Sequence, residues 1–466
     1  MSSSKNDVHI LIFPFPAQGH ILPLLDFTHQ LLLHGFKITI LVTPKNVPIL
    51  DPLLSSHPSL GVLDFPFPGH PSLPAGVENI KDVGNSGNAP FIGGLSKLRG
   101  PILEWFKAQS NPPVAIGYDF FLGWTLDLAQ EVGVPGIVFY SSGALLVSIF
   151  VDIWKNFEAY RDLGFVEFNG LPKSPRLVRE HLPSVFQKYK EGDPDWEIVR
   201  NGLIANGRSF GSIFNTFEAL ESEYLGFLKE MGHERVYSIG PVNLVGGPGR
   251  IGKPNVDDDA NESVFTWLDK CPNESVLYVA FGSQKLLTKA QLEALTIGLE
   301  KSGVKFILVV KQLTAQQEEQ GFGSLPLGFE ERVLGRGLVI KGWAPQVEIL
   351  GHRAVGGFLS HCGWNSALEA IVAGVLILGW PMEADQFVNV WLLVDNMKAS
   401  VRVCEGPNTV PDPIELGRRI NEAMCDSLIK ERAKKMRDEA IEAVRIGGSS
   451  KRDLDSIVKE LAQLKS

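Results

Sequence analysis

Short apolar runs alternate with longer stretches of helical periodicity along both halves of this chain, and this rhythm limits the folds open to it. In the first half we expect a helix at 21–34 and strands at 8–13, 37–43, 114–118 and 136–140. The second half repeats the rhythm, with a helix at 290–302 and strands at 276–281, 306–310, 337–343, 354–360 and 375–378. Such alternation is typical of a parallel sheet covered by helices on both faces. The sequence therefore predicts an α/β fold with two similar, doubly wound lobes.

The chain has 466 residues, which is more than one ordinary core accommodates, so two domains are expected. Residues 246–262 are rich in Gly, Pro and Asp, which is the composition of an exposed linker. We expect a first domain at 1–245, a second at 263–445 and a cleft between them. The tail is rich in helix formers, and residues 446–466 are expected to form a C-terminal helix.

Composition excludes several classes of function. The net charge of −9 and the absence of a Lys/Arg stripe argue against nucleic-acid binding. Four scattered cysteines lack the spacing of a metal site or a disulfide framework. The N-terminal apolar run is soon broken by prolines, unlike a signal peptide, and no apolar stretch is long enough to span a bilayer. A cytoplasmic enzyme without membrane insertion is expected.

Two motifs in the linker resemble binding sites without their required context. Residues 247–253 satisfy GxxxxGK, but Pro254 stands where a P-loop carries Ser or Thr, and no strand precedes the motif. The acidic run 257–259 is interpreted as a solvated charge cluster, because it lies in a Gly/Pro-rich linker. The sequence therefore predicts neither a triphosphate site nor a metal site here.

A strand, a glycine turn and a helix start follow one another between 354 and 374. Free backbone N–H groups and the helix dipole make such a junction an anion site, and His361, Asn365 and Ser366 add side-chain donors. A diphosphate would fit this junction. The alternative is that Ser366 and Glu369 form only a capping box, which any α/β protein can contain.

The residues around this junction favour a nucleotide sugar. Trp343 follows an apolar run, where its indole can stack on a planar base. Glu369 lies one helical turn beyond the junction, within reach of ribose hydroxyls. Asp385 and Gln386 follow the strand at 375–378, where their polar side chains are suited to sugar hydroxyls.

His20 is the histidine best placed to act as a general base near pH 7. It follows the first strand through a proline-rich turn and starts a helix, at the edge of a parallel sheet where ligands collect. Asp119 ends another strand and can fix the imidazole tautomer. The alternatives are a helix cap for His20 and a turn former for Asp119.

The segment 343–386 resembles, without a gap, the nucleotide-sugar signature of the plant secondary-product UDP-glycosyltransferases of family 1. The motif PxxxGHxxP, at 16–23, and the strand-end Asp119 match the catalytic pair of that family. The resemblance is strongest in the branch acting on flavonoids and phenolic acids, which the segment 404–413 also resembles. It implies the GT-B fold, with two Rossmann-like lobes, and a C-terminal helix that returns toward the first lobe.

The same resemblance assigns the donor site. It implies that Trp343 faces uracil, that Ala344 belongs to the donor site, that Gln346 and Glu369 hold ribose, and that His361, Asn365 and Ser366 hold the diphosphate. The remaining donor residues are implied to contact the phosphates or the sugar: Gly282, Ser283, Ser141, Trp364, Asp385 and Gln386. Gln386 is the residue that glucose users of the family usually carry, where galactose users have His, and Trp364 stands where some glucuronic acid users have Arg. UDP-glucose is therefore the expected co-substrate, with pentose and rhamnose donors left open.

By the same implication, the reaction is a single inverting displacement by a monomer, with no permanently bound cofactor and no metal. Six aromatic residues are candidates for an acceptor pocket suited to a flavonoid, although each is individually more typical of a core: Phe91, Phe120, Phe121, Trp124, Phe150 and Trp196. Both O- and C-glycosylation stay open. A non-catalytic nucleotide binder is a distant alternative, and an oxidoreductase is disfavoured because Pro14 to Pro16 occupy the turn where GxGxxG would lie.

Overall fold

The computed structural model describes residues 8–84, 87–245, 258–283 and 285–464. The chain divides into two compact units, Met1–Lys253 with Ala440–Ser466, and Pro254–Glu439. The GxxxxGK motif of the expected linker lies outside the described residues. The end of that expected linker is helical, because α12 begins at Asp258.

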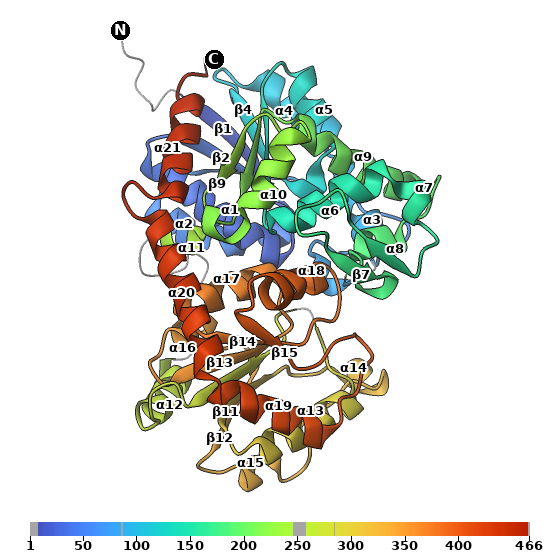
Figure 1. Ribbon diagram of the computed structural model, residues 1–466. Coiled ribbons are helices and arrows are strands. Elements are labelled where there is room, and N and C mark those ends of the chain that lie inside the picture. Colours follow the sequence, from blue (N-terminus) through green and yellow to red (C-terminus); the bar gives the residue numbers. More distant parts are fainter. Residues whose placement is uncertain (1–7, 85–86, 246–257, 284, 465–466) are drawn as a thin grey trace. The chain divides into compact units, whose positions relative to one another are not determined.

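The first unit is built on a seven-stranded sheet with every neighbouring pair parallel (Figure 1). Its order is β3 (Gly61–Asp64), β2 (Lys37–Val42), β1 (His9–Phe13), β4 (Ala115–Asp119), β5 (Gly136–Tyr140), β8 (Gly211–Phe214) and β9 (Val236–Ser238). Its α-helices are α1 (Gln18–Leu33), α2 (Asp51–Ser56), α3 (Asn88–Ser96), α4 (Arg99–Ala108), α5 (Thr125–Glu131), α6 (Ala144–Lys155), α7 (Phe157–Tyr160), α8 (Ser184–Lys188), α9 (Pro194–Ala205), α10 (Glu218–Glu230), α11 (Val242–Val245) and α21 (Ser449–Leu461). Short 3-10 turns include η2 (Pro44–Leu50), η3 (Ile80–Asp82), η5 (Phe120–Leu122), η6 (Arg179–His181) and η7 (Asn206–Arg208).

The second unit is built on a six-stranded parallel sheet. Its order is β12 (Gly337–Lys341), β11 (Lys305–Val310), β10 (Val276–Ala280), β13 (Val355–Ser360), β14 (Leu376–Gly379) and β15 (Ser400–Arg402). Its helices are α12 (Asp258–Asp269), α13 (Lys289–Ser302), α14 (Ala315–Glu319), α15 (Phe329–Arg332), α16 (Gln346–Leu350), α17 (Trp364–Ala373), α18 (Gln386–Val390), the π-helical η8 (Trp391–Asn396), α19 (Pro413–Cys425) and α20 (Ser427–Val444).

Each sheet reverses its winding direction once. In the first unit the chain runs from β1 outward to β3 and then returns to add β4 on the other side of β1. In the second unit it runs from β10 outward to β12 and returns to add β13 beside β10. Ligands of open parallel sheets bind beyond the carboxyl ends of the strands at such a switch point. The fold therefore offers one binding position per sheet, after β1 and β4 and after β10 and β13.

The C-terminal helix α21 completes the core of the first unit, where it lies along β9 (Figure 1). Its apolar face is fully buried, and one edge is fixed by Asp453, which accepts hydrogen bonds from the Ser238 backbone and hydroxyl at 2.7 and 3.0 Å. Tyr237 donates to Glu460 at 2.6 Å. The helix is thus joined to the sheet by both apolar packing and polar contacts.

The predicted α/β fold class is confirmed, and the expected strands at 8–13, 37–43, 114–118 and 136–140 correspond to β1, β2, β4 and β5. The expected strand at 337–343 ends earlier, at Lys341, because Gly342 adopts a left-handed backbone with φ of 106°. Four short strands of the two sheets were not predicted, because they are too brief to show a period in the sequence: β3, β8, β9 and β15.

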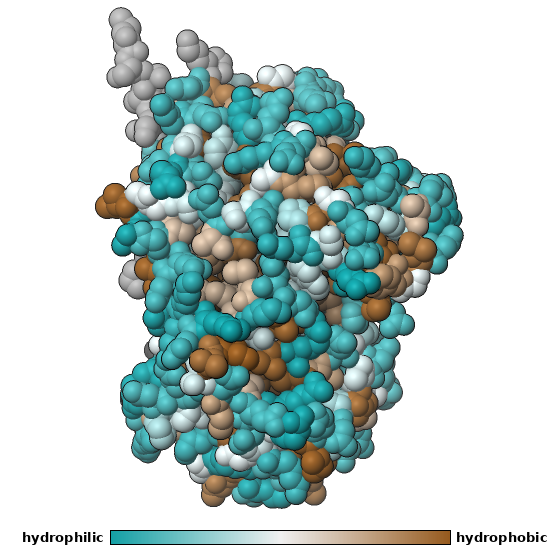
Figure 2. Space-filling view, in the orientation of Figure 1, coloured by the Kyte–Doolittle hydropathy of each residue, from teal (hydrophilic) through white to brown (hydrophobic). Residues whose placement is uncertain are grey.

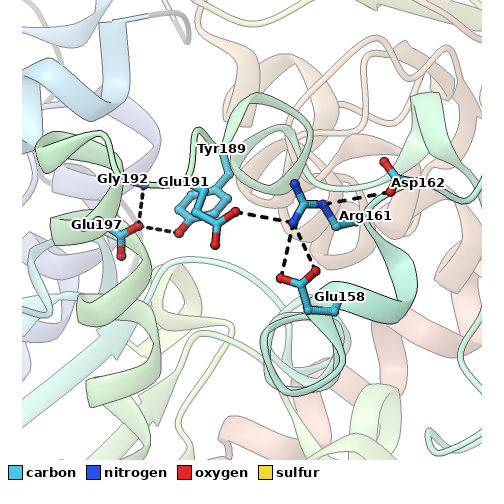
Figure 3. A network of polar contacts seen from close by, with 7 residues as sticks. All are labelled: Glu158, Arg161, Asp162, Tyr189, Glu191, Gly192 and Glu197. Atoms are coloured by element: carbon cyan, nitrogen blue, oxygen red, sulfur yellow. Dashed lines mark hydrogen bonds and ion pairs between the residues drawn. The ribbon is translucent and has the colours of Figure 1, made fainter.

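The segment between β5 and β8 carries an antiparallel pair, β6 (Phe165–Glu167) and β7 (Arg176–Val178), with the helices α7 to α9. A polar network fixes the loop before α9 (Figure 3). In it Arg161 pairs with Glu158 and Glu191 at 3.0 and 3.4 Å, and Tyr189 donates to Glu197 at 2.6 Å. These surface contacts define the course of the loop, although exposed pairs of this kind contribute little stability.

Hydrophilic side chains cover most of the molecular face seen in Figure 2. In the part of the chain that is described, no helix combines the length and apolar character needed to cross a bilayer. The four cysteines are free thiols, and only Cys425 is exposed.

Gly123 allows η5 to approach α9 closely, because a Cβ atom at this position would lie 2.1 Å from the carbonyl oxygen of Gly202. We predict that Gly123→Ala destabilises the first unit by ~1–3 kcal/mol or more, since backbone atoms cannot rotate away. The matched control is Gly226→Ala on α10, where a Cβ meets nothing within 4 Å. Ala there should stabilise the helix by ~0.5–1 kcal/mol. Thermal unfolding of both variants checks the pair, and equal unfolding temperatures would contradict it.

The buried His233 is expected to lower the stability of the first unit as the pH falls. The side chain is 3% exposed, and burial lowers its pKa to about 4. Because the unfolded chain keeps a pKa near 6.5, it binds more protons between pH 6.5 and 4, and the stability contribution is lost as the pH falls through that window. The loss reaches at most ~3 kcal/mol.

We predict that His233→Asn is less stable than wild type at pH 7 but loses less stability between pH 7 and 5. The asparagine can keep a hydrogen bond to Ser212, whose Oγ lies 2.9 Å from His233 Nδ1, without taking up a proton. Urea midpoints of both proteins at pH 7 and pH 5 measure how much stability each one loses. An equal loss in wild type and His233→Asn would refute this origin of the acid sensitivity.

Candidate active site

Three neighbouring strands of the first sheet bring His20, Asp119 and Ser141 together. Phe13, the last residue of β1, pairs with Tyr118 of β4, and Asp119 ends β4. β5 lies next to β4, and Ser141 follows its last residue. His20 stands in the first turn of α1, which begins at Gln18 rather than at the expected residue 21. All three residues therefore lie at the switch point of this sheet.

The imidazole of His20 is oriented by a buried carboxylate. Its Nδ1 lies 2.9 Å from Asp119 Oδ2, and the side chains are 19% and 0% exposed. The other oxygen of Asp119 accepts the backbone N–H of Phe121 at 2.9 Å. With Nδ1 donating to the carboxylate, Nε2 is the ring nitrogen that can accept a proton. The arrangement can act as a general base and stabilise the resulting imidazolium.

Ser141 lies beside His20, with its Oγ 3.1 Å from the same Nδ1. Its turn is fixed by Glu221, a carboxylate that the sequence analysis missed. Glu221 accepts the backbone N–H groups of Ala144 and Leu145 at 2.9 and 2.8 Å, and burial raises its pKa. No local pattern indicates this contact, because Glu221 is far from α6 in the sequence.

Aromatic rings enclose the His20 imidazole. The rings of Phe120 and Phe121 stack on it at 5.2 and 5.0 Å, and the Phe15 ring meets it edge-on at 5.3 Å. Phe15 was not among the predicted acceptor residues, although it lies in the proline-rich turn that the sequence analysis singled out. Phe121 is partly exposed and Phe120 is 2% exposed. The base therefore has an apolar surrounding suited to a flat aromatic ligand.

The other aromatic candidates lie further into the protein. Phe91 is fully buried and packs on Phe15 at 5.8 Å, and Trp124 packs edge-on against Phe13 at 5.9 Å. Phe150, on α6, is 5% exposed. Trp196, on α9, is 8% exposed and packs against Tyr189. Phe150 and Trp196 thus have the burial of core residues.

In the second unit, two glycines make room for His361. Gly282 follows β10 with a left-handed φ of 72°, and Gly363 lies two residues after His361. A Cβ on either glycine would stand 2.7 Å from His361 Nε2. Since β10 pairs with β13 and His361 follows β13, these groups lie at the switch point of the second sheet. Ser283 follows Gly282 in the same turn.

His361 is a neutral imidazole at pH 7. Burial lowers its pKa to about 4, with a further contribution from the positive charge of Lys311. Its buried Nδ1 has no hydrogen-bond partner among the residues that the structure describes. A neutral ring can offer one N–H to an anionic oxygen but no charge.

The helix α17 begins at this junction, with Gly363 as its N-cap and no side-chain capping bond. Ser366 is therefore already inside the first turn, and the capping-box alternative for Ser366 and Glu369 is wrong. Gln346 Nε2 instead donates to Glu369 at 2.6 Å and lies 3.2 Å from the Ser366 hydroxyl. The predicted ribose pair, Gln346 and Glu369, is thus brought together, and Asn365 lies beside it in the first turn of α17.

Trp343 and Ala344 lie between β12 and α16. The Trp343 side chain is 40% exposed, which is uncommon for an indole and leaves its ring accessible for stacking, whereas Ala344 is buried. Trp364, in contrast, is 3% exposed at the start of α17.

The turn before α18 holds Asp385 and Gln386. Gln386 is 6% exposed, and its amide oxygen accepts the backbone N–H groups of Met382 and Glu383 at 2.9 and 3.1 Å. Asn389 donates to Asp385 at 2.9 Å and to the Cys362 carbonyl at 2.9 Å. Asn389 therefore joins the turn to the residue after His361, a link that the sequence analysis missed.

No group of three or more His, Cys, Asp or Glu side chains within the described ranges could hold a metal ion.

Known proteins resemble this chain in sequence and in fold. The family described as UDP-glucoronosyl and UDP-glucosyl transferase matches residues 254–415. The chain is 48% identical to UDP-glycosyltransferase 89A2 of Arabidopsis thaliana, over 99% of this chain and 98% of that protein. It is 46% identical to flavonol 3-O-glucosyltransferase UGT89B1 of Arabidopsis thaliana, with the same coverage.

A solved structure of Arabidopsis thaliana UGT89C1 complexed with UDP-L-rhamnose superposes with a TM-score of 0.80 at 36% identity, covering 99% of this chain and 100% of the other. This similarity extends over the whole chain and confirms the GT-B class of fold. The chain therefore belongs to the plant family 1 UDP-glycosyltransferases, enzymes that transfer a sugar from a UDP-sugar donor.

Proposed function

We propose that this enzyme is an inverting glucosyltransferase that moves glucose from UDP-glucose to a phenolic oxygen of a flavonoid. The observation that carries the proposal is the pair formed by His20 and the buried Asp119, enclosed by aromatic rings. The flavonol specificity in the name of UGT89B1 supports the acceptor class.

In the proposed reaction, His20 Nε2 takes the phenol proton while the phenolic oxygen bonds to the anomeric carbon of glucose. The bond from that carbon to the β-phosphate oxygen breaks, and its electron pair leaves with UDP. Asp119 stabilises the imidazolium that forms. Attack from the side opposite the leaving group inverts the anomeric configuration. Positioned hydrogen-bond donors at the departing diphosphate supply the electrostatic part of catalysis.

We assign the donor to the second unit, at the switch point after β10 and β13. There Trp343 stacks on uracil, Gln346 and Glu369 hold ribose, and the diphosphate lies at the α17 N-terminus. The diphosphate donors are His361, Asn365 and Ser366 with the turn at Gly282 and Ser283, while Trp364, Asp385 and Gln386 hold the sugar. The exposed Trp343 ring and the bonded Gln346–Glu369 pair support this assignment.

The acceptor is assigned to residues 1–245, around Phe15, Phe120 and Phe121. Residues 263–445 bind the donor, 246–262 link the two domains, and 446–466 close the first domain. Ser141 has two proposed contacts. It contacts the sugar, as the family resemblance implies, and it lies beside His20. We further propose that the protein acts as a cytoplasmic monomer without a bound metal.

Rhamnose is the second candidate sugar, because the related UGT89C1 is described in complex with UDP-L-rhamnose. We favour glucose because Gln386 stands at the position that glucose users of the family usually share. The amide oxygen of Gln386 accepts the backbone N–H groups of Met382 and Glu383, which fixes the position of the side chain.

A C-glucoside is the alternative product. A phenol that has lost its proton carries negative charge on the ortho carbons as well as on oxygen, so the same base serves both reactions. The atom that faces the anomeric carbon decides the outcome.

The proposed function is tested by incubating the protein with a flavonol panel and either UDP-glucose or UDP-rhamnose. We predict release of UDP and a mass gain of one hexose with UDP-glucose, and loss of that hexose on acid hydrolysis, because an O-glucoside is acid-labile. A sugar that survives acid identifies the C-glucoside. Faster turnover with UDP-rhamnose would overturn the donor assignment, and no UDP release with either donor would overturn the function.

We predict that His20→Ala lowers kcat by ~10²–10⁴-fold, which is the usual contribution of a general base. The affinity for UDP, measured by calorimetry, should stay nearly unchanged, because the residues assigned to uracil, ribose and diphosphate belong to the second unit. His34→Ala is the matched control, since His34 caps the other end of α1 and donates to the Gln30 carbonyl. Retention of most activity by His20→Ala would show that another group removes the proton.

A further inference from the structure

Lys311 lies at the same edge of the second sheet as the proposed diphosphate site. It directly follows β11, and its Nζ donates to the backbone carbonyl of Ser283 at 2.6 Å. β11 and β13 flank β10 on its two sides. The ammonium group therefore stands beside the turn after β10, which in turn contacts His361 through Gly282.

The ammonium group has no carboxylate partner among the described residues. Within the described part of the chain Lys311 forms no ion pair, and the charged group that acts on it is Lys285, a second cation. Burial and Lys285 lower the pKa of Lys311 to about 8, so most molecules still carry the proton at pH 7. The Lys311 side chain is partly exposed, so its ammonium group is accessible to a ligand, and an anionic ligand would supply the missing counter-charge.

The donor diphosphate needs positive charge that the predicted residues do not supply. His361 is neutral at pH 7. Asn365 and Ser366 are uncharged, and the α17 N-terminus contributes roughly half a unit charge. When UDP leaves, the diphosphate gains one further negative charge, because it keeps the electron pair of the broken bond.

We propose that Lys311 is a donor-binding residue whose ammonium group contacts the diphosphate and stabilises the departing UDP. This inference rests on the proposed function, because it adds a residue to the same donor site. The Ser283 carbonyl holds the side chain beside the turn, and the two glycines keep the approach to His361 open.

The test compares Lys311→Met with Lys305→Met. Lys305 is the matched control, because it begins the same strand, its Nζ also reaches a backbone carbonyl, that of Gly335, and it lies far from the turn after β10. Calorimetry with UDP and with uridine should show UDP affinity reduced ~10- to 100-fold in Lys311→Met, the usual value of a charge-assisted hydrogen bond. Uridine affinity should stay within about twofold, and Lys305→Met should resemble wild type.

Lys311→Arg provides the rescue, because guanidinium keeps the charge and should restore most of the UDP affinity. Undiminished UDP binding by Lys311→Met would overturn the inference, as would an equal loss of UDP and uridine binding, which indicates a collapsed site. Failure of the wild-type protein to bind UDP is a separate result that overturns the proposed function itself. The expected pattern is a loss confined to the phosphate-bearing ligand and reversed by arginine.

Discussion

The parallel pairing of the strands is the constraint on which the rest of the structure depends. Since parallel strands all end at one edge, the residues that follow them share a small region even when they are far apart in the chain. His20 and Asp119 meet because β1 and β4 are neighbours, and Gly282 and His361 meet because β10 and β13 are neighbours. Each sheet thus assembles its candidate site at the point where its winding reverses.

The two candidate sites differ in the charge that they hold next to a histidine. At the first, the Asp119 carboxylate is buried against His20, so the imidazole can become positive when it takes a proton. At the second, His361 is kept neutral by burial, and the cation beside it, Lys311, has no carboxylate partner within the described residues. The first arrangement suits proton removal and the second suits an anionic ligand, which are the two tasks of a glycosyl transfer.

Long apolar strands and the residues directly after them could be predicted from the sequence, which is why β1, β4, β10 and β13 and their strand-end residues were found. Contacts made across the fold could not, because nothing local encodes them: Glu221 reaches α6 from a distant helix, and Asn389 reaches back to Cys362. Aromatic residue type likewise does not separate core from pocket, because Phe120, which stacks on His20, is as buried as Phe150.

The dependence of the first sheet on α21 has a consequence for how the protein is made. The core of the first unit includes Leu454, Ile457 and Leu461, which are synthesised after the whole second unit. At ~5–20 residues per second, the interval between the two parts of the first unit is roughly 10–40 s. During this interval the apolar surface that α21 later covers stays exposed on the nascent first unit. Chaperones that bind exposed apolar surface can act on it until α21 has been synthesised.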